Sequence, residues 1–204
     1  MKSPVYKYNE LTWRQVLHGY SIGIFPMGDD EDGTISWYEA SPRAIMPIEM
    51  KSSGISIPRS LKQVINKNTF KVTVDKSFNE VIDACSDRLS TWINLLIRKA
   101  YTELHKEGFA HSIETWHDGR LAGGLYGVAY KGAFFGESMF RRENNASKVA
   151  VVKLYEILKK NKFLLFDIQM MTTHFKSFGA IEISRRAYLE ILERAMEVSR
   201  DFKS

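Results

Sequence analysis

The stretch AFFGESMF, residues 133–140, and the stretch FDIQMMTTHFKSFGA, residues 166–180, decide how the fold of this chain is interpreted. Each stretch places one acid inside an apolar, strand-like run: Glu137 in the first and Asp167 in the second. Burying an unpaired carboxylate is strongly unfavourable. Two acids in such surroundings therefore indicate a functional site on the strands of a sheet.

The spacing within these stretches predicts which side chains meet. Alternate residues of an extended strand share one face, so Asp167 and Gln169 are expected to project together, an acid beside a neutral hydrogen-bonding partner. The same parity pairs Glu137 with Met139, and Gly136 leaves room for a backbone or a ligand to approach closely. We interpret this pattern as a pocket wall that handles a proton and holds an apolar group.

Composition describes an ordinary folded protein. The 204 residues suit one domain, or a domain with a small extra lobe, and 44% hydrophobic residues can form a substantial core. Cys85 is the only cysteine, which excludes an internal disulfide and a multi-cysteine metal site. The first ten residues, MKSPVYKYNE, lack the apolar core of a secretory signal, and no apolar run is long enough to span a membrane. We expect a cytoplasmic protein.

The formal net charge of +5 favours an acidic partner, of which nucleic acid is the commonest. Arg59, Lys62 and Lys67 follow one another at helical spacing. Such charges usually serve only to solvate an exposed face, and the alternative is a patch that contacts phosphates. The charge alone does not decide between the two.

The chain divides into residues 1–43, which are rich in glycine, proline, aspartate and aromatic residues, and a more regular part, residues 44–204. The first part predicts one helix, 11–18, ended by Gly19 and followed by loops. In the second part, turns at Asp118-Gly119 and Lys131-Gly132 predict a three-stranded antiparallel meander. The elements expected in the second part are strands from residue 45 and at 70–74, 111–116, 121–130, 133–140 and 163–169, and helices from residue 58 and at 77–85, 94–106, 147–160 and 186–198. This order predicts an α+β fold with an N-acyltransferase-like sheet behind a small N-terminal domain.

An ordered series of short motifs covers nearly the whole chain, and it resembles the leucyl/phenylalanyl-tRNA–protein transferase family. The order of so many motifs is far more specific than any one of them. The motifs are GIFPM at 23–27, a tryptophan-led SPR segment at 37–43, PRSLK at 58–62, TWI at 91–93, AHSIETW at 110–116, GGLYG at 123–127, GESMFRR at 136–142, ASK at 146–148 and the DIQ…H…SFGA series from residue 167.

This resemblance implies a GNAT-like catalytic domain and an aminoacyltransferase. The enzyme would move leucine, and also phenylalanine or methionine, from aminoacyl-tRNA to the α-amino group of proteins that begin with arginine or lysine. The product would be a degradation signal of the N-end rule. The resemblance implies no cofactor and no metal, and a self-contained core makes a monomer the expected state.

The resemblance also assigns roles to individual residues. Asp167 and Gln169 would form a proton relay, Glu137 would orient the substrate, and Trp92 would stack on the terminal adenosine of the tRNA. The other assigned residues would bind the substrate or the tRNA. Leu125, Phe134, Met139, Leu154, Leu158 and Phe166 would form the apolar pocket for the aminoacyl group, Gly136 and Thr172 would also bind the substrate, and Arg59, Lys62 and Lys67 would contact the acceptor stem.

Structural interpretations stand beside these roles. Glu137 could pair with Arg141 or Lys148 instead of binding a substrate, and Trp92 could belong to the core, as most tryptophans do. Asp167 could be an ordinary acid at the end of a strand. The histidines show no HExxH spacing, so a zinc hydrolase is not indicated, and His174 is interpreted as a structural histidine.

Two other functional classes share parts of this pattern. An acetyl-CoA-dependent N-acetyltransferase would have a similar sheet, but it needs a glycine-rich pyrophosphate loop before the central helix. The corresponding stretch here, RRENNASK at 141–148, contains no glycine. A catalytically inactive RNA-binding module is the second alternative. The presence of both Asp167 and Gln169 argues against it.

Overall fold

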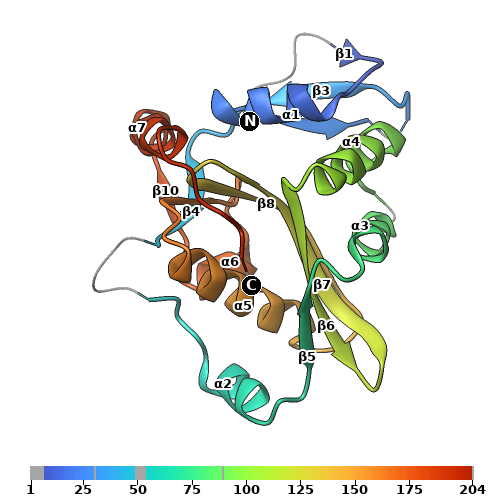
Figure 1. Ribbon diagram of the computed structural model, residues 1–204, viewed down its shortest axis with the longest axis vertical. Helices are drawn as coiled ribbons and strands as arrows, with labels where there is room; N and C mark the ends of the chain where they lie inside the picture. Colours follow the sequence, from blue (N-terminus) through green and yellow to red (C-terminus); the bar gives the residue numbers. More distant parts are fainter. Residues whose placement is uncertain (1–6, 30, 49–53, 89, 204) are drawn as a thin grey trace.

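The computed structural model describes residues 7–29, 31–48, 54–88 and 90–203 (Figure 1). Residues 1–6, on which part of the expectation about a secretory signal depends, lie outside the described residues. Across the described ranges, no helix combines the length and the apolar character needed to cross a membrane.

The N-terminal part forms a lobe with a small sheet of its own. It contains β1 (Lys7–Tyr8), α1 (Trp13–Ser21), β2 (Phe25–Gly28) and β3 (Ile35–Tyr38), and the strands pair antiparallel in the order β1-β3-β2. Thr12 and Gln15 cap α1 reciprocally. The helix was predicted from the sequence, but loops were expected where the structure has the strands β2 and β3. The helix was also expected to end at Gly19, whereas α1 continues through this residue to Ser21. The glycine is needed for packing, because a Cβ at this position would lie 2.1 Å from the ring of Trp37.

The larger sheet has seven strands in the order β10-β4-β9-β8-β7-β6-β5. All neighbours are antiparallel except β8 and β9, which run parallel because α5 connects them. The predicted meander is confirmed, and Asp118 and Lys131 adopt the positive φ angles that its two tight turns require. The strand bounds are β4 (Arg43–Met46), β5 (Lys71–Val74), β6 (Ala110–His117), β7 (Arg120–Tyr130), β8 (Ala133–Arg141), β9 (Leu165–Asp167) and β10 (Ile181–Ile183).

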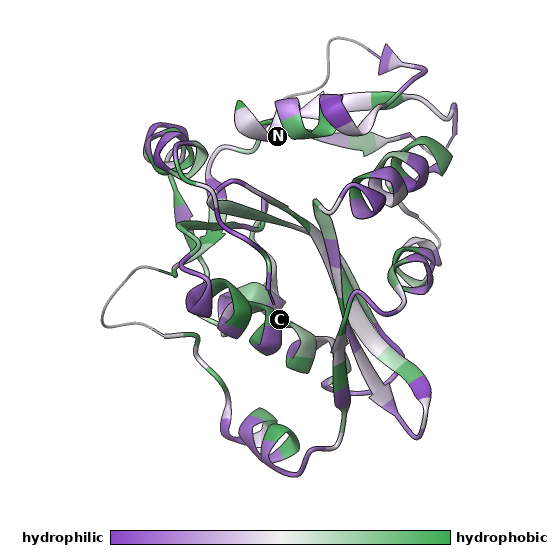
Figure 2. Cartoon of the chain, in the orientation of Figure 1, coloured by the Kyte–Doolittle hydropathy of each residue, from purple (hydrophilic) through white to green (hydrophobic). Residues whose placement is uncertain are grey.

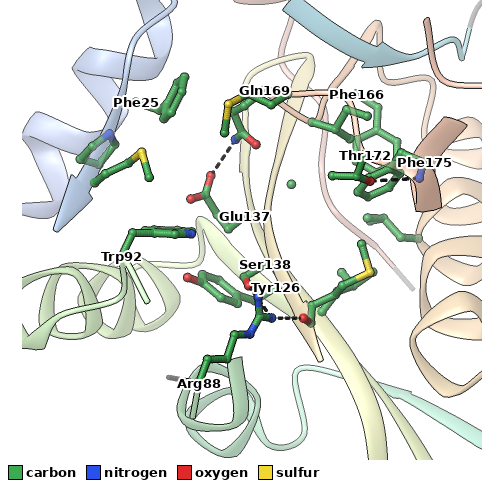
Figure 3. Close-up of a pocket in the computed structure, with 18 residues that line it drawn as sticks. Phe25, Arg88, Trp92, Tyr126, Glu137, Ser138, Phe166, Gln169, Thr172 and Phe175 are labelled. Carbon is green, nitrogen blue, oxygen red and sulfur yellow. Dashed lines mark hydrogen bonds between the residues drawn. The ribbon is translucent and has the colours of Figure 1, made fainter. Parts of the chain in front are cut away.

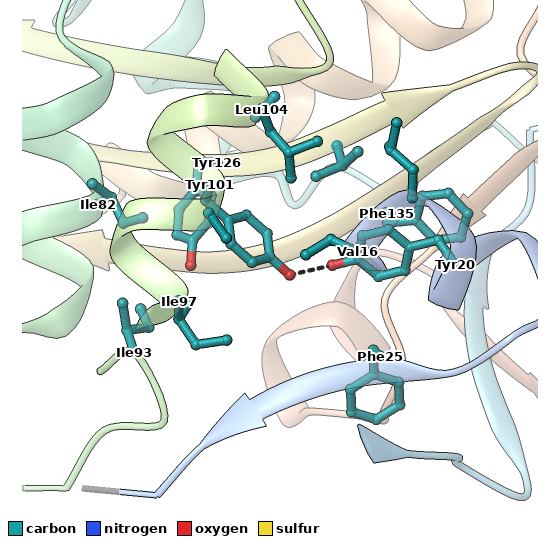
Figure 4. Close-up of a cluster of buried hydrophobic side chains, with 14 of the residues drawn as sticks. Val16, Tyr20, Phe25, Ile82, Ile93, Ile97, Tyr101, Leu104, Tyr126 and Phe135 are labelled. Atoms are coloured by element: carbon teal, nitrogen blue, oxygen red, sulfur yellow. Dashed lines mark hydrogen bonds between the residues drawn. The ribbon is translucent and has the colours of Figure 1, made fainter. Parts of the chain in front are cut away.

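Helices cover both faces of this sheet, with α5 on one side of the meander and α3 and α4 on the other (Figure 1). Apolar side chains of the helices are turned inward, so hydrophobic and hydrophilic residues alternate along them (Figure 2). Two buried clusters result, one on each face. The cluster beneath α1 and α4 is dominated by aromatic and aliphatic side chains (Figure 4). The helix bounds are α2 (Arg59–Asn66), α3 (Phe78–Ser86), α4 (Leu95–Lys106), α5 (Ala146–Lys160), α6 (Thr173–Ser177) and α7 (Arg185–Met196).

The structure confirms the α+β class with a small N-terminal lobe, and it corrects one local prediction. The strand expected at 163–169 ends at Asp167, and Gln169 has a φ of 56°. The expectation that strand parity would place Asp167 and Gln169 on one face is therefore wrong. The short elements β10 and α6 escaped the sequence analysis because three to five residues carry too little periodicity to be recognised.

Candidate active site

One pocket of about 260 Å³ opens where the N-terminal lobe meets the middle of the large sheet (Figure 3). Its walls come from β2, from the loop before α4, from β7 and β8, and from the chain that follows β9. Apolar side chains form most of the lining, together with a few polar and charged groups. The residues that line the pocket are Phe25, Pro26, Met27, Arg88, Trp92, Leu125, Tyr126, Gly136, Glu137, Ser138, Met139, Leu154, Phe166, Ile168, Gln169, Met170, Thr172 and Phe175.

A β-bulge directs Glu137 into this pocket. Tyr126 pairs with Ser138 and Gly127 pairs with Gly136, so Glu137 has no partner in the ladder. A bulge of this kind bends the strand and re-aims one side chain. Gly127 allows the close approach, because a Cβ at this position would lie 2.4 Å from the carbonyl oxygen of Phe135.

Three hydrogen bonds hold the Glu137 carboxyl group. The Tyr20 hydroxyl donates to Oε1 at 2.5 Å, the Tyr101 hydroxyl donates to Oε2 at 3.0 Å, and the Gln169 amide Nε2 donates to Oε1 at 3.1 Å. Burial raises the pKa of Glu137 to about 7, although the tyrosine hydrogen bonds act in the opposite direction. Glu137 can therefore gain or lose a proton near neutral pH. Among the described residues its partners do not include Arg141 or Lys148.

Asp167 lies behind the pocket, fully buried, and is not among the lining residues. The Arg43 guanidinium donates to both of its carboxylate oxygens, at 2.9 Å from Nε to Oδ1 and 2.6 Å from Nη2 to Oδ2. The Tyr188 hydroxyl donates to Oδ2 at 2.7 Å. Arg43 is itself buried, and its guanidinium lies over the rings of Phe25 and Tyr188. Asp167 is thus a charge-compensated anchor.

Gln169 connects this anchor to the pocket. Its backbone N–H donates to Oδ1 of Asp167 at 2.8 Å, while its side chain reaches Glu137. The left-handed conformation of Gln169 makes this turn possible, a conformation in which an L-residue needs support from its surroundings. A continuous chain of contacts runs from Arg43 through Asp167 and Gln169 to Glu137.

The structure brings most of the predicted substrate residues together and separates two from them. Trp92, Leu125, Gly136, Met139, Leu154, Phe166 and Thr172 all line the pocket. Phe134 and Leu158 are fully buried in the core on the α5 side and are not among the lining residues. The resemblance implied that both positions lie in the aminoacyl pocket, whereas the structure packs both side chains into the core.

Several lining or supporting residues were missed. Tyr20 comes from α1 and Tyr101 from α4, and no local pattern indicates that two tyrosines from separate helices converge on Glu137. Tyr126, Arg88 and Phe175 also line the pocket. Tyr126 lies in a continuous run of apolar and glycine residues in β7, which is typical of a strand buried on both faces and is the one signal that the sequence offers for this set.

The predicted tRNA-binding residues and His174 lie outside the pocket lining. Arg59 and Lys62 lie on α2 and Lys67 follows it, all three exposed, at the end of the molecule opposite the N-terminal lobe (Figure 1). His174 lies on α6, where burial lowers its pKa and Lys148 adds to the effect. The described ranges contain no group of three or more residues of the types that hold a metal ion.

Comparison with known proteins identifies the relatives of this chain. The family profile for leucyl/phenylalanyl-tRNA protein transferase matches residues 49–193, and that for the N-terminal domain of the same transferase matches residues 9–41. The transferase of this name from Salinibacter ruber is 46% identical over 194 residues, covering 95% of this chain and 84% of that protein. Those from Herpetosiphon aurantiacus and Akkermansia muciniphila are each 44% identical, covering 92% and 93% of this chain and 95% and 98% of the respective proteins.

Two solved structures show a distant likeness to this chain. A GCN5-related N-acetyltransferase-like protein from Streptococcus suis has a TM-score of 0.42 at 11% identity, covering 84% of this chain and 64% of that one. The C-terminal domain of a putative lysylphosphatidylglycerol synthetase from Agrobacterium fabrum has a TM-score of 0.44 at 11% identity, with coverage of 96% and 65%. The assignment of this chain to a family rests on the two family profiles and the three relatives. The chain is an aminoacyltransferase that belongs to the leucyl/phenylalanyl-tRNA protein transferase family.

Proposed function

We propose that this enzyme transfers leucine, and also phenylalanine or methionine, from aminoacyl-tRNA to the α-amino group of proteins that begin with arginine or lysine. The product is a degradation signal of the N-end rule, made in the cytoplasm by a monomer without a cofactor. The observation that carries this proposal is an apolar pocket with Trp92 on one wall and the hydrogen-bonded pair Glu137 and Gln169 on another.

The terminal adenine and the amino acid side chain of the donor would occupy opposite sides of the pocket. The indole of Trp92 offers a flat surface on which the terminal adenine can stack. The leucine or phenylalanine side chain would lie among the apolar residues on the other side of Glu137, and the ester would then lie near the polar pair (Figure 3). This apolar wall consists of Leu125, Met139, Leu154, Phe166, Ile168 and Phe175.

The chemistry needs positioning and one proton acceptor. The ester of aminoacyl-tRNA is already activated, and an α-amine has a pKa near 7.7, so much of it is neutral at working pH. The amine nitrogen attacks the ester carbonyl, a C–N bond forms, the C–O bond to the ribose breaks, and the ribose oxygen takes a proton. Well-placed reactants can supply about 7 kcal/mol of the barrier. We assign proton transfer to Glu137, which titrates near neutral pH.

Asp167 and Gln169 act together in this proposal. Both carboxylate oxygens of Asp167 are occupied by Arg43, Tyr188 and the Gln169 backbone, so Asp167 acts through Gln169 as a positioning residue. The Gln169 amide donates to Glu137 and leaves its carbonyl oxygen to accept a hydrogen bond from the incoming amine. The relay thus runs from the amine along Gln169 and Glu137, with Asp167 fixing the geometry.

Transfer of labelled leucine from charged tRNA to two peptides tests this function. One peptide begins with arginine and the other with aspartate, and acetyl-CoA is offered as a competing donor. We expect incorporation into the arginine peptide alone. Incorporation into the aspartate peptide alone would keep the chemistry and change the acceptor, and acetylation without leucine transfer would refute the proposal.

Shortening Met139 should alter the choice of amino acid. Met139→Ala widens the apolar wall, so kcat/KM for leucyl-tRNA should fall about tenfold, because lost apolar contact in a pocket is worth roughly 1–3 kcal/mol. Phenylalanyl-tRNA should lose less, since its larger ring fills the new space. Competition between the two donors measures the ratio. The control is Met196→Ala, a partly buried methionine outside the pocket lining. An unchanged ratio in the Met139 variant would contradict the pocket assignment.

Charge reversal on and beside α2 tests the tRNA contact. Replacing Arg59, Lys62 and Lys67 with glutamate should weaken binding of charged tRNA and make it less salt-dependent, since each lost phosphate contact lowers the slope of log K against log salt by nearly one unit. Binding of a small aminoacyl-adenosine analogue should not change. If full-length tRNA binds the variant with the original slope, these residues only solvate the surface.

A further inference from the structure

The hydroxyl of Tyr126 is a buried polar group without a partner. It is 0% exposed, and no atom among the described residues forms a hydrogen bond with it, although Tyr126 lines the pocket. The ring is held edge-on against Phe78 and Tyr101, with centroid distances of 5.9 Å and 5.8 Å. The hydroxyl therefore cannot swing away to find another partner.

The neighbouring tyrosines show that this is a local exception. Tyr20 and Tyr101 donate to Glu137, and Tyr188 donates to Asp167. Buried hydroxyls are normally paired, because an unpaired one carries the full cost of its lost hydration. Burial raises the pKa of Tyr126 well above its ordinary value, so the hydroxyl stays protonated and remains a donor. A ligand that brings an acceptor oxygen would satisfy it.

The position of Tyr126 narrows the choice of ligand atom. In Figure 3 its ring lies on the Trp92 side of the pocket, below Glu137, whereas Phe166 and Phe175 lie on the opposite side. In the proposed donor complex the adenine occupies the Trp92 side and the amino acid side chain occupies the side of Phe166. The sugar that joins them then lies between, beside Glu137 and Tyr126.

The chemistry of the donor identifies the acceptor oxygen. The terminal ribose carries the aminoacyl ester on one of two neighbouring oxygens, and the other oxygen remains a free hydroxyl. This hydroxyl can accept one hydrogen bond while it donates another to a carboxylate. Among the lining residues, the phenol of Tyr126 can donate the first of these hydrogen bonds and the carboxyl group of Glu137 can accept the second.

We propose that the Tyr126 hydroxyl donates a hydrogen bond to the free ribose hydroxyl of the terminal adenosine, and so positions the aminoacyl ester against Glu137 and Gln169. This role rests on the proposed function, because it needs an aminoacyl-adenosine end in the pocket. Tyr126 is then a residue that binds the donor, and its contact favours a ribonucleotide end over a deoxyribonucleotide end.

Calorimetric binding of two non-reactive donor analogues tests this contact. The analogues are 3′-leucylamido-3′-deoxyadenosine, which keeps the 2′-hydroxyl, and its 2′-deoxy counterpart. Wild-type protein should bind the first about tenfold more tightly, since one buried hydrogen bond is lost with the hydroxyl. In Tyr126→Phe the two dissociation constants should be equal, and kcat/KM for leucyl-tRNA should fall about tenfold. The variant should unfold at the same or a higher temperature, because it loses an unsatisfied hydroxyl.

Two control variants separate this role from a structural one. Tyr155→Phe removes a hydroxyl that donates to the Pro47 carbonyl at 3.0 Å, outside the pocket lining, and should lower stability while the analogue preference stays tenfold. Thr115→Val removes another unpaired buried hydroxyl and should also keep the preference. If Tyr126→Phe keeps the preference or the wild-type kcat/KM, the proposal is overturned. If wild-type protein binds the analogues but transfers no leucine, the proposed function fails and the Tyr126 contact is still tested.

Discussion

Replacement of Arg43 by methionine is expected to destabilise the protein by about 3–5 kcal/mol, because the change leaves the Asp167 carboxylate buried without its counter-charge. Both side chains of this ion pair are essentially inaccessible, at 1% and 0% exposed. Urea unfolding of Arg43→Met at neutral pH measures the loss.

The matched control for this prediction is Arg98→Met, which breaks an exposed ion pair with Asp83. Its cost should be about 1 kcal/mol or less, since solvent screens such pairs. The double variant Arg43→Met/Asp167→Asn should recover much of the lost stability, because it removes the stranded charge. Equal losses in the Arg43 and Arg98 variants would show that charge compensation at Asp167 is not what the buried arginine supplies.

Replacement of Glu137 by glutamine is expected to lower kcat/KM for leucine transfer about 100-fold at pH 8, the lower end of what a positioned proton acceptor contributes. The amide has nearly the same shape and can still accept from Tyr20 or Tyr101, so the site should keep its geometry. The wild-type rate should rise with pH as Glu137 ionises near 7 and as the substrate α-amine loses its proton near 7.7, and the variant should keep only the rise that belongs to the amine. A pH profile of single-turnover transfer measures both effects.

Although Glu137→Gln should lower activity, it should not lower the stability of the protein at pH 8. The native state holds the Glu137 proton more tightly than the unfolded chain, because the folded pKa of about 7 exceeds the ordinary value of 4.5. This contribution is complete below about pH 4.5 and is lost as pH rises through 7, and it amounts to about 3 kcal/mol at most. Glu137→Gln should therefore be as stable as the wild type, or more stable, at pH 8.

Glu114→Gln is the control for the Glu137 predictions. Glu114 is also a buried carboxylate, hydrogen-bonded to Thr73, Ser112 and the backbone of Ser77, and it lies outside the pocket lining. Its replacement should lower stability without changing the pH profile of transfer. A Glu137→Gln enzyme that keeps at least half of the wild-type rate across pH 6–9 would exclude Glu137 from proton transfer.

The regular part of the fold could be predicted because it depends on local patterns. Alternation and two tight turns fix the meander of β6, β7 and β8, and apolar spacing fixes α4 and α5. The strands of the N-terminal lobe could not be found in this way, because β2 and β3 have only four residues each and run through glycine, proline and polar positions.

The candidate site could be located but not fully assembled from the sequence. Glu137, Gln169 and Trp92 were found through motifs, and the structure brings them to one pocket. The partner of Asp167 is 124 residues away along the chain, and no local pattern links the two positions. The bulge at Glu137 is also invisible in the sequence, because it depends on how β7 and β8 register against each other.

The hydrogen bond from Tyr20 to Glu137 spans 117 residues and joins the N-terminal lobe to the large sheet. Residues 9–41 and residues 49–193 match separate family profiles, yet one chemical group depends on both. The two segments are therefore not interchangeable modules. If recombination exchanged one segment between distant relatives, the contact between Tyr20 on α1 and Glu137 at the bulge of β8 would have to be kept. We therefore expect the two segments to be inherited together.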